Sequence, residues 1–332
     1  MNNSDFNRTL DLCVVTMLLA GCGGVQPSVV APVAAPLQSR VRSGLAAATT
    51  PGLRPALQRL DYKVTAPLLY VTNYGVTYND VSVYRAAAKH PSPFASISAG
   101  IDTPSGACID GQGTLYVTNQ PPSGLGWISE YPLGKTAPSK VIKNGVNTPA
   151  FCAIDAKGNL WVTNIGLDDV AEYLKGATKP HTVITSGLTF PVGIAIDRSG
   201  NLYVGNGWNA SQRNVEVYSP GGKSPSRTIT DGITWPVGIA VDSAGTLYIT
   251  NAEQNNVEEY RSGQDHPFQT ITKAMNSPVD VTVNKKGSLY VTNMGNNTVV
   301  EFPSGSLTPS KRQISKGLED PEGAAYYPAS LP

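Results

Sequence analysis

The chain has 332 residues, and its 25 Lys or Arg residues nearly balance its 24 Asp or Glu residues, giving a formal net charge of +1. Acids and bases are interspersed, so no concentrated basic face and no nucleic-acid partner are expected. Hydrophobic residues make up 40% of the chain, with Tyr, Val, Ile and Thr abundant, which is enough for a sizeable core of strand-forming side chains.

The first 22 residues have the pattern of a processing signal. The stretch 12–20 is apolar but too short to cross a bilayer as a helix. It ends in Leu-Ala-Gly-Cys22, which resembles a bacterial lipobox. That resemblance implies cleavage before Cys22, lipid attachment to its thiol and, from Gly23, sorting to the outer membrane or cell surface. The alternative is an ordinary secretory signal and a soluble secreted or periplasmic protein, because Arg8 is the only basic residue before the apolar stretch.

Residues 23–60 differ in composition from the rest of the chain. They are rich in Pro, Ala, Ser, Val and Thr and show no hydrophobic periodicity. Such a segment buries too little apolar surface to order itself, so we expect a disordered tether. The folded domain is expected over residues 61–332.

A pentamer of the form Leu-aromatic-β-branched-Thr-Asn recurs six times in this domain, once with Gly205 in place of Thr. A repeat of this length indicates a solenoid, a propeller or a similar array. The six copies end at Asn73, Asn119, Asn164, Asn206, Asn251 and Asn293. We expect each Asn to cap the loop that follows it, as Asn commonly does, rather than to form a ring of ligand-binding groups.

Each repeat contains four strand-like runs. In the fullest copy they span 191–197, 201–206, 214–218 and 227–230, bounded by Gly, Pro, Asn or Asp. This pattern predicts four antiparallel strands in a meander. The first two runs are joined by Asp-x-x-Gly or Asn-x-x-Gly, which is typical of a tight turn. The turns are expected at Asp110–Gly113, Asp155–Gly158, Asp197–Gly200, Asp242–Gly245 and Asn284–Gly287.

The two ends of the repeat array predict a closed ring. The first copy lacks the Pro-x-Gly strand that should precede it, whereas residues 321–327 form one such strand with nothing after it. We therefore predict that 321–327 supplies the innermost strand of the first unit. The expected fold is all-β, a six-bladed β-propeller with four antiparallel strands per blade, closed by the C-terminal strand. Closure removes exposed sheet edges.

The patterns Pro-x-Gly-Ile-Ala-Val-Asp and Gly-x-Leu-Tyr-Val-Thr-Asn resemble the NHL repeat. This repeat belongs among the wider six-bladed propellers that include gluconolactonase- and regucalcin-like proteins. The resemblance covers about residues 62–328 and implies the fold. It implies much less about function, because the same architecture is shared by lactonases, lyases and interaction modules.

The resemblance to gluconolactonases implies where a metal would be held, at the residue before the Gly of each inner strand. Here that column is Ser105, Ala150, Val192, Val237, Val279 and Glu322. A divalent cation needs several converging oxygen ligands, and only Glu322 is a carboxylate, so no metal or other cofactor is expected. The alternative is a divergent lactonase- or lyase-like hydrolase that binds Ca²⁺ or Zn²⁺ near Glu322, with ligands from Asp280, Asp102 or Asp320.

Histidines and cysteines offer no obvious catalytic centre. His90, His181 and His266 each lie in a link between a third and a fourth strand, so they are expected to be exposed and far apart. Cys108 and Cys152 fall on inner strands of successive blades and on opposite strand faces, so they can meet across one blade interface. We expect buried free thiols; the alternative is a disulfide, which an exported protein could form.

The loops of one propeller face break the symmetry of the repeat. This face carries the loops from second to third strands and the links from each blade to the next, which together hold several aromatic and acidic residues. Such groups on rigidly held loops are typical of recognition surfaces. The candidate binding residues are Glu322, Asp280, Trp208, Trp127, Tyr78 and Trp235.

An alternative role for Trp235 is to wedge between blades. From these features we predict an exported, lipid-anchored, monomeric binding or scaffolding module. Its partner would be an extracytoplasmic protein, peptide or polysaccharide, and it would touch the membrane only through its lipid anchor.

Overall fold

The computed structural model describes residues 61–89, 91–207 and 212–328. The predicted signal and tether, with Cys22, lie outside these residues, as do His90 and Trp208. No helix in the described part of the chain is long and apolar enough to cross a membrane.

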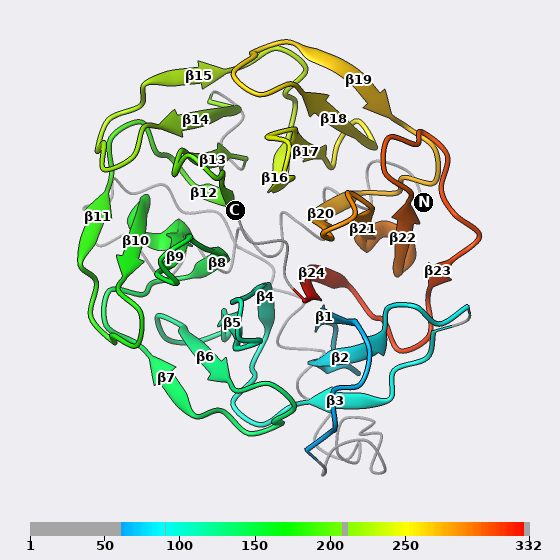
Figure 1. Ribbon diagram of the computed structural model, residues 1–332. Coiled ribbons are helices and arrows are strands. Elements are labelled where there is room, and N and C mark those ends of the chain that lie inside the picture. Colours follow the sequence, from blue (N-terminus) through cyan, green and yellow to red (C-terminus); the bar gives the residue numbers. More distant parts are fainter. Residues whose placement is uncertain (1–60, 90, 208–211, 329–332) are drawn as a thin grey trace, which may run out of the picture.

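Six four-stranded antiparallel sheets are arranged around a central axis (Figure 1). The first blade comprises β24 (Pro321–Tyr327), β1 (Leu68–Tyr74), β2 (Asn79–Arg85) and β3 (Ala95–Ile97). The second comprises β4 (Pro104–Ile109), β5 (Leu115–Asn119), β6 (Trp127–Tyr131) and β7 (Lys140–Ile142). The third comprises β8 (Pro149–Ile154), β9 (Leu160–Asn164), β10 (Asp169–Tyr173) and β11 (Thr182–Ile184).

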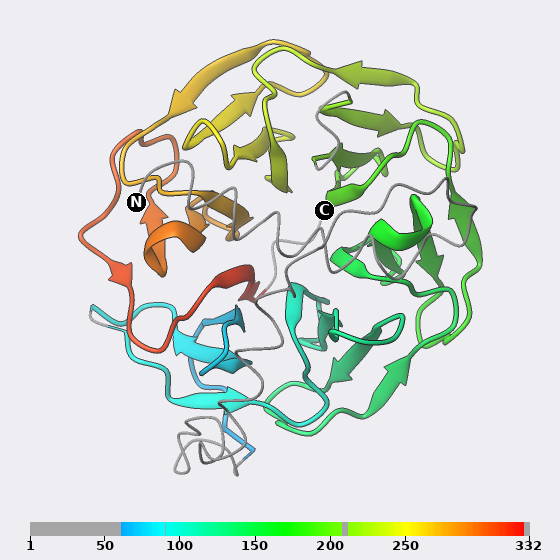
Figure 2. The same ribbon diagram turned by 180° about the vertical axis from the view of Figure 1, so that it is seen from behind.

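The remaining three blades repeat this order. The fourth comprises β12 (Pro191–Ile196), β13 (Leu202–Asn206), β14 (Asn214–Tyr218) and β15 (Arg227–Ile229). The fifth comprises β16 (Pro236–Val241), β17 (Leu247–Asn251), β18 (Asn256–Tyr260) and β19 (Pro267–Ile271). The sixth comprises β20 (Pro278–Val283), β21 (Leu289–Asn293), β22 (Thr298–Phe302) and β23 (Gln313–Ile314). From either side, the first strand of each blade lies nearest the axis and the fourth at the rim (Figure 2).

The ring is closed by the C-terminal strand, as the sequence predicted. β24 pairs antiparallel with β1, with Leu68 opposite Tyr327 and Val71 opposite Ala324. In Figure 1 the red strand β24 therefore lies beside the blue strand β1. The two ends of the repeat array therefore share one blade, and the inner edge of β1 is paired with β24.

Alternate side chains of each second strand pack against different neighbours. In the fourth blade, Leu202 and Val204 belong to a core cluster that includes Val170 of the third blade. Tyr203, which lies between them, belongs instead to a cluster that includes Leu247 of the fifth blade. The two-residue period of a strand therefore explains the Leu-aromatic-β-branched pattern, because both faces of the strand are buried between blades.

The predicted tight turns join first to second strands. In the fourth blade, Asp197 Oδ1 accepts hydrogen bonds from the backbone N–H of Ser199 at 2.8 Å and of Asn201 at 2.9 Å. Gly200 has a φ of +84°, and its N–H donates to the Asp197 carbonyl. Only a residue without Cβ adopts this conformation readily, which explains why Gly occupies this position.

The six recurrent asparagines are buried parts of the scaffold. Asn251 Nδ2 donates to Asn256 Oδ1 at the start of the next strand, as expected for a cap of the following loop. It also donates to the Gly232 carbonyl, and its Oδ1 accepts from the Thr234 N–H at 3.0 Å. Gly232 and Thr234 lie in the link that arrives from the preceding blade. Each Asn therefore also holds the link from the preceding blade in place by hydrogen bonds, which the sequence did not predict.

Candidate functional site

We call the face that carries the second-to-third-strand loops and the links between blades the upper face. The loops of the first, second and third blades lie at 75–78, 120–126 and 165–168. The links that flank them lie at 315–320, 98–103 and 143–148. The scaffold beneath is repeated in every blade, so differences between blades on this face are where a specific site can arise.

The inner strands surround the axis with a largely apolar ring. Ala150, Val192, Val237 and Val279 are at most 6% exposed and belong to one hydrophobic cluster. They come from four different blades, so the strands of these blades meet through apolar contacts. Ser105, which is also buried, and Glu322 complete the six positions.

Glu322 is the one carboxylate of this axial ring. Burial raises its pKa to about 7, and the nearby charge of Asp320 acts in the same direction. A hydrogen bond with the Ser105 side chain opposes the shift. A carboxyl group with this pKa is partly protonated at neutral pH, so it can both donate and accept hydrogen bonds.

Asp280, a candidate binding residue, lies neither in the axial ring nor among the exposed side chains of the upper face. It occupies the position that Gly238 and Gly323 hold in their blades, on the strand face turned toward the next blade. Its side chain is 5% exposed, and its Oδ2 accepts a hydrogen bond from the Ala324 N–H of the closing strand at 2.7 Å. Burial raises the pKa of Asp280 to about 8. Asp280 therefore belongs to the junction that closes the ring.

The carboxylates proposed as metal ligands have separate partners. Asp102 Oδ1 accepts a hydrogen bond from Asn79 Nδ2, whereas Asp280 Oδ2 accepts one from the Ala324 N–H. Within residues 61–89, 91–207 and 212–328, no three His, Cys, Asp or Glu side chains are grouped closely enough to hold a metal ion.

Two of the three histidines lie in the described part of the chain, and both are exposed. His266 contacts Asp231 through Nδ1 and Oδ2 at 2.6 Å, with 79% of its side chain exposed. His181 is exposed in the link between β10 and β11. These two therefore occupy the peripheral positions that the sequence predicted.

The candidate aromatic residues divide between surface and core. Trp127 is half-buried at the start of β6, its Nε1 donates to the Gly100 carbonyl, and Lys143 Nζ lies 5.8 Å from its ring centroid. Tyr78 is also half-buried on the upper face.

Trp235 is only 7% exposed and packs in the axial cluster. The Arg213 guanidinium lies 5.1 Å from its ring centroid. Its ring is therefore buried among residues of several blades, in the position of the alternative role, a wedge between blades.

Three exposed aliphatic residues on the upper face escaped the sequence analysis. Val76 is 80% exposed, Leu125 62% and Leu167 45%. They lie in the second-to-third-strand loops of the first, second and third blades. The sequence offered only a weak signal, an aliphatic residue directly after a Gly in a loop, as in Ser-Gly-Leu-Gly.

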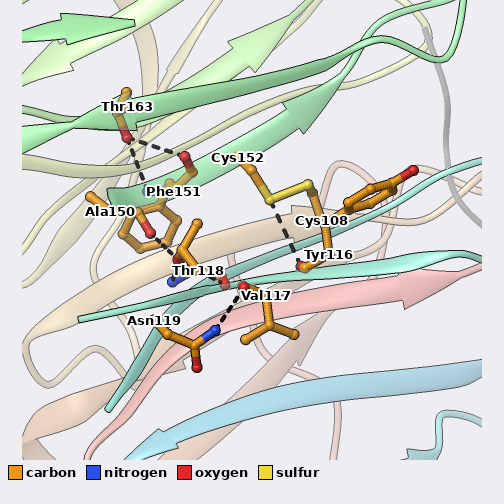
Figure 3. The surroundings of a disulfide bond; sticks show 10 residues. Cys108, Tyr116, Val117, Thr118, Asn119, Ala150, Phe151, Cys152 and Thr163 are labelled. Carbon is orange, nitrogen blue, oxygen red and sulfur yellow. Dashed lines mark hydrogen bonds between the residues drawn. A yellow bond between two sulfur atoms is a disulfide. The ribbon is translucent and has the colours of Figure 1, made fainter. Parts of the chain in front are cut away.

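A disulfide joins Cys108 of β4 to Cys152 of β8, with their Cα atoms 5.6 Å apart (Figure 3). The expectation of free thiols is therefore wrong, whereas the inference that the two residues can meet across one interface is confirmed. The Thr118 hydroxyl accepts the Gly106 N–H within the second blade and donates across the same interface to the Ala150 carbonyl of the third. The second and third blades are thus joined by covalent and hydrogen bonds near the axis.

Comparisons with known proteins support the fold. No protein-family model matches the chain, and no curated protein sequence matches it. A chain in the crystal structure of a nidogen/laminin complex is 21% identical, with a TM-score of 0.67 over 79% of this chain and 98% of that one. A putative 6-phosphogluconolactonase from Bacteroides fragilis is 13% identical, with a TM-score of 0.56 over 78% and 97%.

A third solved structure is equally well covered. A protein of unknown function from Bacteroides caccae is 12% identical, with a TM-score of 0.58 over 79% of this chain and 99% of that one. At these identities the likeness concerns the fold. It agrees with an all-β, six-bladed propeller of four antiparallel strands per blade.

Proposed function

We propose that this chain is an exported, lipid-anchored propeller of the NHL-repeat type that serves as a monomeric binding or scaffolding module. Its partner is a protein, peptide or polysaccharide outside the cytoplasm, bound through the upper face. One observation carries this proposal: the buried scaffold repeats from blade to blade, whereas the upper-face loops differ in length and in exposed side chains. Rigid scaffolds with variable loops are the usual basis of recognition.

Export is supported by two independent features. The sequence Leu-Ala-Gly-Cys22 resembles a lipobox. The disulfide between Cys108 and Cys152 requires an environment in which thiols are oxidised, as outside the cytoplasm. Neither feature depends on the other, because the first concerns the removed segment and the second the folded ring.

Binding is favoured over hydrolysis by the chemistry of the axial ring. Four of its six positions carry the apolar side chains of Ala150, Val192, Val237 and Val279. A hydrolase is the second candidate, because Glu322 retains a carboxyl group with a raised pKa near the axis and a putative lactonase shares the fold. One of the similar folds comes from a complex between two proteins, which supports the first candidate.

Metal analysis of the purified protein separates the two candidates. After dialysis against Ca²⁺ or Zn²⁺ and removal of free ions, we expect much less than one ion per chain and no hydrolysis of glucono-δ-lactone. Glu322→Gln should change neither result. One tightly bound ion per chain that is lost in Glu322→Ala, together with lactone hydrolysis, would establish the hydrolase instead.

The anchor is tested separately in the producing cells. Wild-type protein should incorporate labelled palmitate and sediment with membranes, whereas Cys22→Ala should lose the label because it lacks the acylated thiol. A Cys22→Ala variant that is still labelled would contradict lipid attachment at Cys22.

A further inference from the structure

The exposed aliphatic tips of the first three blades are not required by the fold. The third, fifth and sixth blades have second-to-third-strand loops of four residues, so equivalent positions can be compared directly. At the third loop position stand Leu167, Gln254 and Asn296, and all three are exposed. The same short loop therefore accepts a polar residue at this position, so the fold does not require the apolar side chain of Leu167.

The backbone of these loops confirms that they are equivalent. In the third and sixth blades each begins with a single 3₁₀ turn, Ile165–Leu167 and Met294–Asn296. The following residues, Asp168 and Asn297, have φ values of 50° and 55°. The first loop residues, Ile165 and Met294, are each 8% exposed and pack in the axial cluster, so apolar character at that position has a structural reason. The third position points away from this cluster.

Hydrogen bonds hold the three tips in place. The Glu319 carboxylate accepts the N–H groups of Thr77 and Tyr78, each at 2.8 Å, directly after Val76. The Leu125 carbonyl accepts the Thr148 N–H at 2.7 Å. Beside Leu167, the Gly166 N–H and carbonyl are both bonded to Asn147. A surface fixed in this way loses little conformational entropy when a partner binds.

Negative charge predominates around these tips. Within the three loops and the three links defined above, the charged residues are Asp102, Lys143, Asp168, Lys316, Glu319 and Asp320. These loops and links therefore carry four carboxylates and only two ammonium groups. A partner with basic groups beside its apolar ones would be complementary to this part of the face.

We propose that Val76, Leu125 and Leu167 form an apolar arc that docks an extended peptide segment of a partner protein, in which aliphatic and basic residues alternate. This inference rests on the proposed function and specifies its partner. Alternate side chains of an extended segment point to one side, so its aliphatic residues can all be turned toward the arc. Aliphatic tips favour aliphatic partners, whereas a polysaccharide would present mainly hydroxyl groups to them.

The test uses the purified full-length chain and three fluorescein-labelled decapeptides. One alternates Lys and Leu, one Lys and Ser, and one Glu and Leu, and binding is followed by fluorescence anisotropy. We expect the Lys-Leu peptide to bind most tightly. The double variant Leu125→Ser/Leu167→Asn should weaken this binding by at least about tenfold, because two buried aliphatic contacts are lost.

The matched control replaces two other exposed leucines, away from the upper face. Leu174 and Leu307 are 42% and 43% exposed and follow the ends of β10 and β22 at the opposite face. Leu174→Asn/Leu307→Ser should bind the Lys-Leu peptide as wild type does. Equal melting temperatures of the two double variants show that both are folded.

Four outcomes would overturn this inference: no binding of the Lys-Leu peptide, equal binding by the arc variant, equal binding of the Lys-Ser peptide, or equal binding of the Glu-Leu peptide. The proposed function fails by a different result, namely no adduct in cells from a photo-cross-linker at residue 125. If a photo-cross-linker at residue 125 captures a partner in cells although the Lys-Leu peptide does not bind, the upper face still acts in recognition and only the peptide chemistry is wrong.

Discussion

Replacing Asp280 by Asn tests how the ring is closed. In the folded chain the pKa of Asp280 is about 8, against an ordinary value of 3.8, because burial disfavours the ionised carboxylate. Between these two pKa values, the carboxyl group of Asp280 keeps its proton in the folded chain and loses it in the unfolded chain. The stability associated with this proton is fully present below about pH 4 and is lost as the pH rises toward 8.

The size of this effect follows from the difference between the two pKa values. Four pH units at 1.36 kcal/mol each correspond to a loss on the order of 5 kcal/mol in the free energy of unfolding. Asn cannot ionise, but its Oδ1 can still accept the Ala324 N–H that Asp280 binds. Asp280→Asn should therefore resemble wild type near pH 4 and be more stable by several kcal/mol at pH 8.5.

Urea denaturation at pH 4.5, 6, 7 and 8.5, followed by tryptophan fluorescence, measures this difference. Asp102→Asn provides the control, since it removes one carboxylate from the upper face without touching β24. This control shows how much a change of net charge alone contributes to the free energy of unfolding. If the stability of Asp280→Asn falls with pH as steeply as that of wild type, the account of Asp280 as a buried, protonated part of the closure is wrong.

Three further predictions concern the scaffold. Cys108→Ala/Cys152→Ala should lower the free energy of unfolding by about 4 kcal/mol, because the disulfide closes a loop across a sequence separation of 44; an unchanged denaturation midpoint, with wild type showing no free thiols, would contradict this. Deleting residues 319–332 should abolish a cooperative thermal transition near the wild-type temperature, since β1 then loses its inner partner; an unchanged melting temperature would refute the closure. Asn251→Ala should cost about 2–3 kcal/mol by leaving partly buried backbone groups without their partner, whereas Gln254→Ala in the neighbouring exposed loop should change stability by less than about 0.5 kcal/mol; equal losses in the two variants would show that the Asn251 bonds add nothing.

The blade architecture was predictable because its signals are local and repeated. Asp197 and Gly200 specify a turn by their own backbone chemistry, and the same pattern recurs in other blades. The unpaired repeat strand at 321–327 specified closure because only one position in the array lacked a strand. These inferences needed counting and local conformation, with no knowledge of side-chain packing.

The parts that the sequence did not predict depend on packing between blades. Whether Cys108 and Cys152 are bonded depends on fractions of an ångström between two strands, which no spacing in the sequence encodes. Asp280 was proposed as an acidic candidate near the loops of one face, yet its side chain is buried and accepts a hydrogen bond from the backbone of the closing strand. Trp235 was placed on a loop by its position before Pro, but its ring fills the axial cluster.

The aliphatic tips were missed for a different reason. Val76, Leu125 and Leu167 lie in loops, and a single aliphatic residue in a loop carries no clear signal in the sequence. They could be recognised as a group only when the structure gave their exposure and placed them on successive blades of one face. A comparison with the equivalent Gln254 and Asn296 then showed that the fold does not require an aliphatic residue at position 167.

Photo-cross-linking in the producing cells tests most directly whether the upper face is the binding surface. A photoreactive amino acid replaces either Leu125 on the upper face or Leu174 on the opposite face, both of which are exposed. Adducts are identified by mass spectrometry after irradiation. We predict a discrete adduct from position 125 and none from position 174. Adducts from position 174 alone, or the same adducts from both positions, would contradict recognition through the upper face.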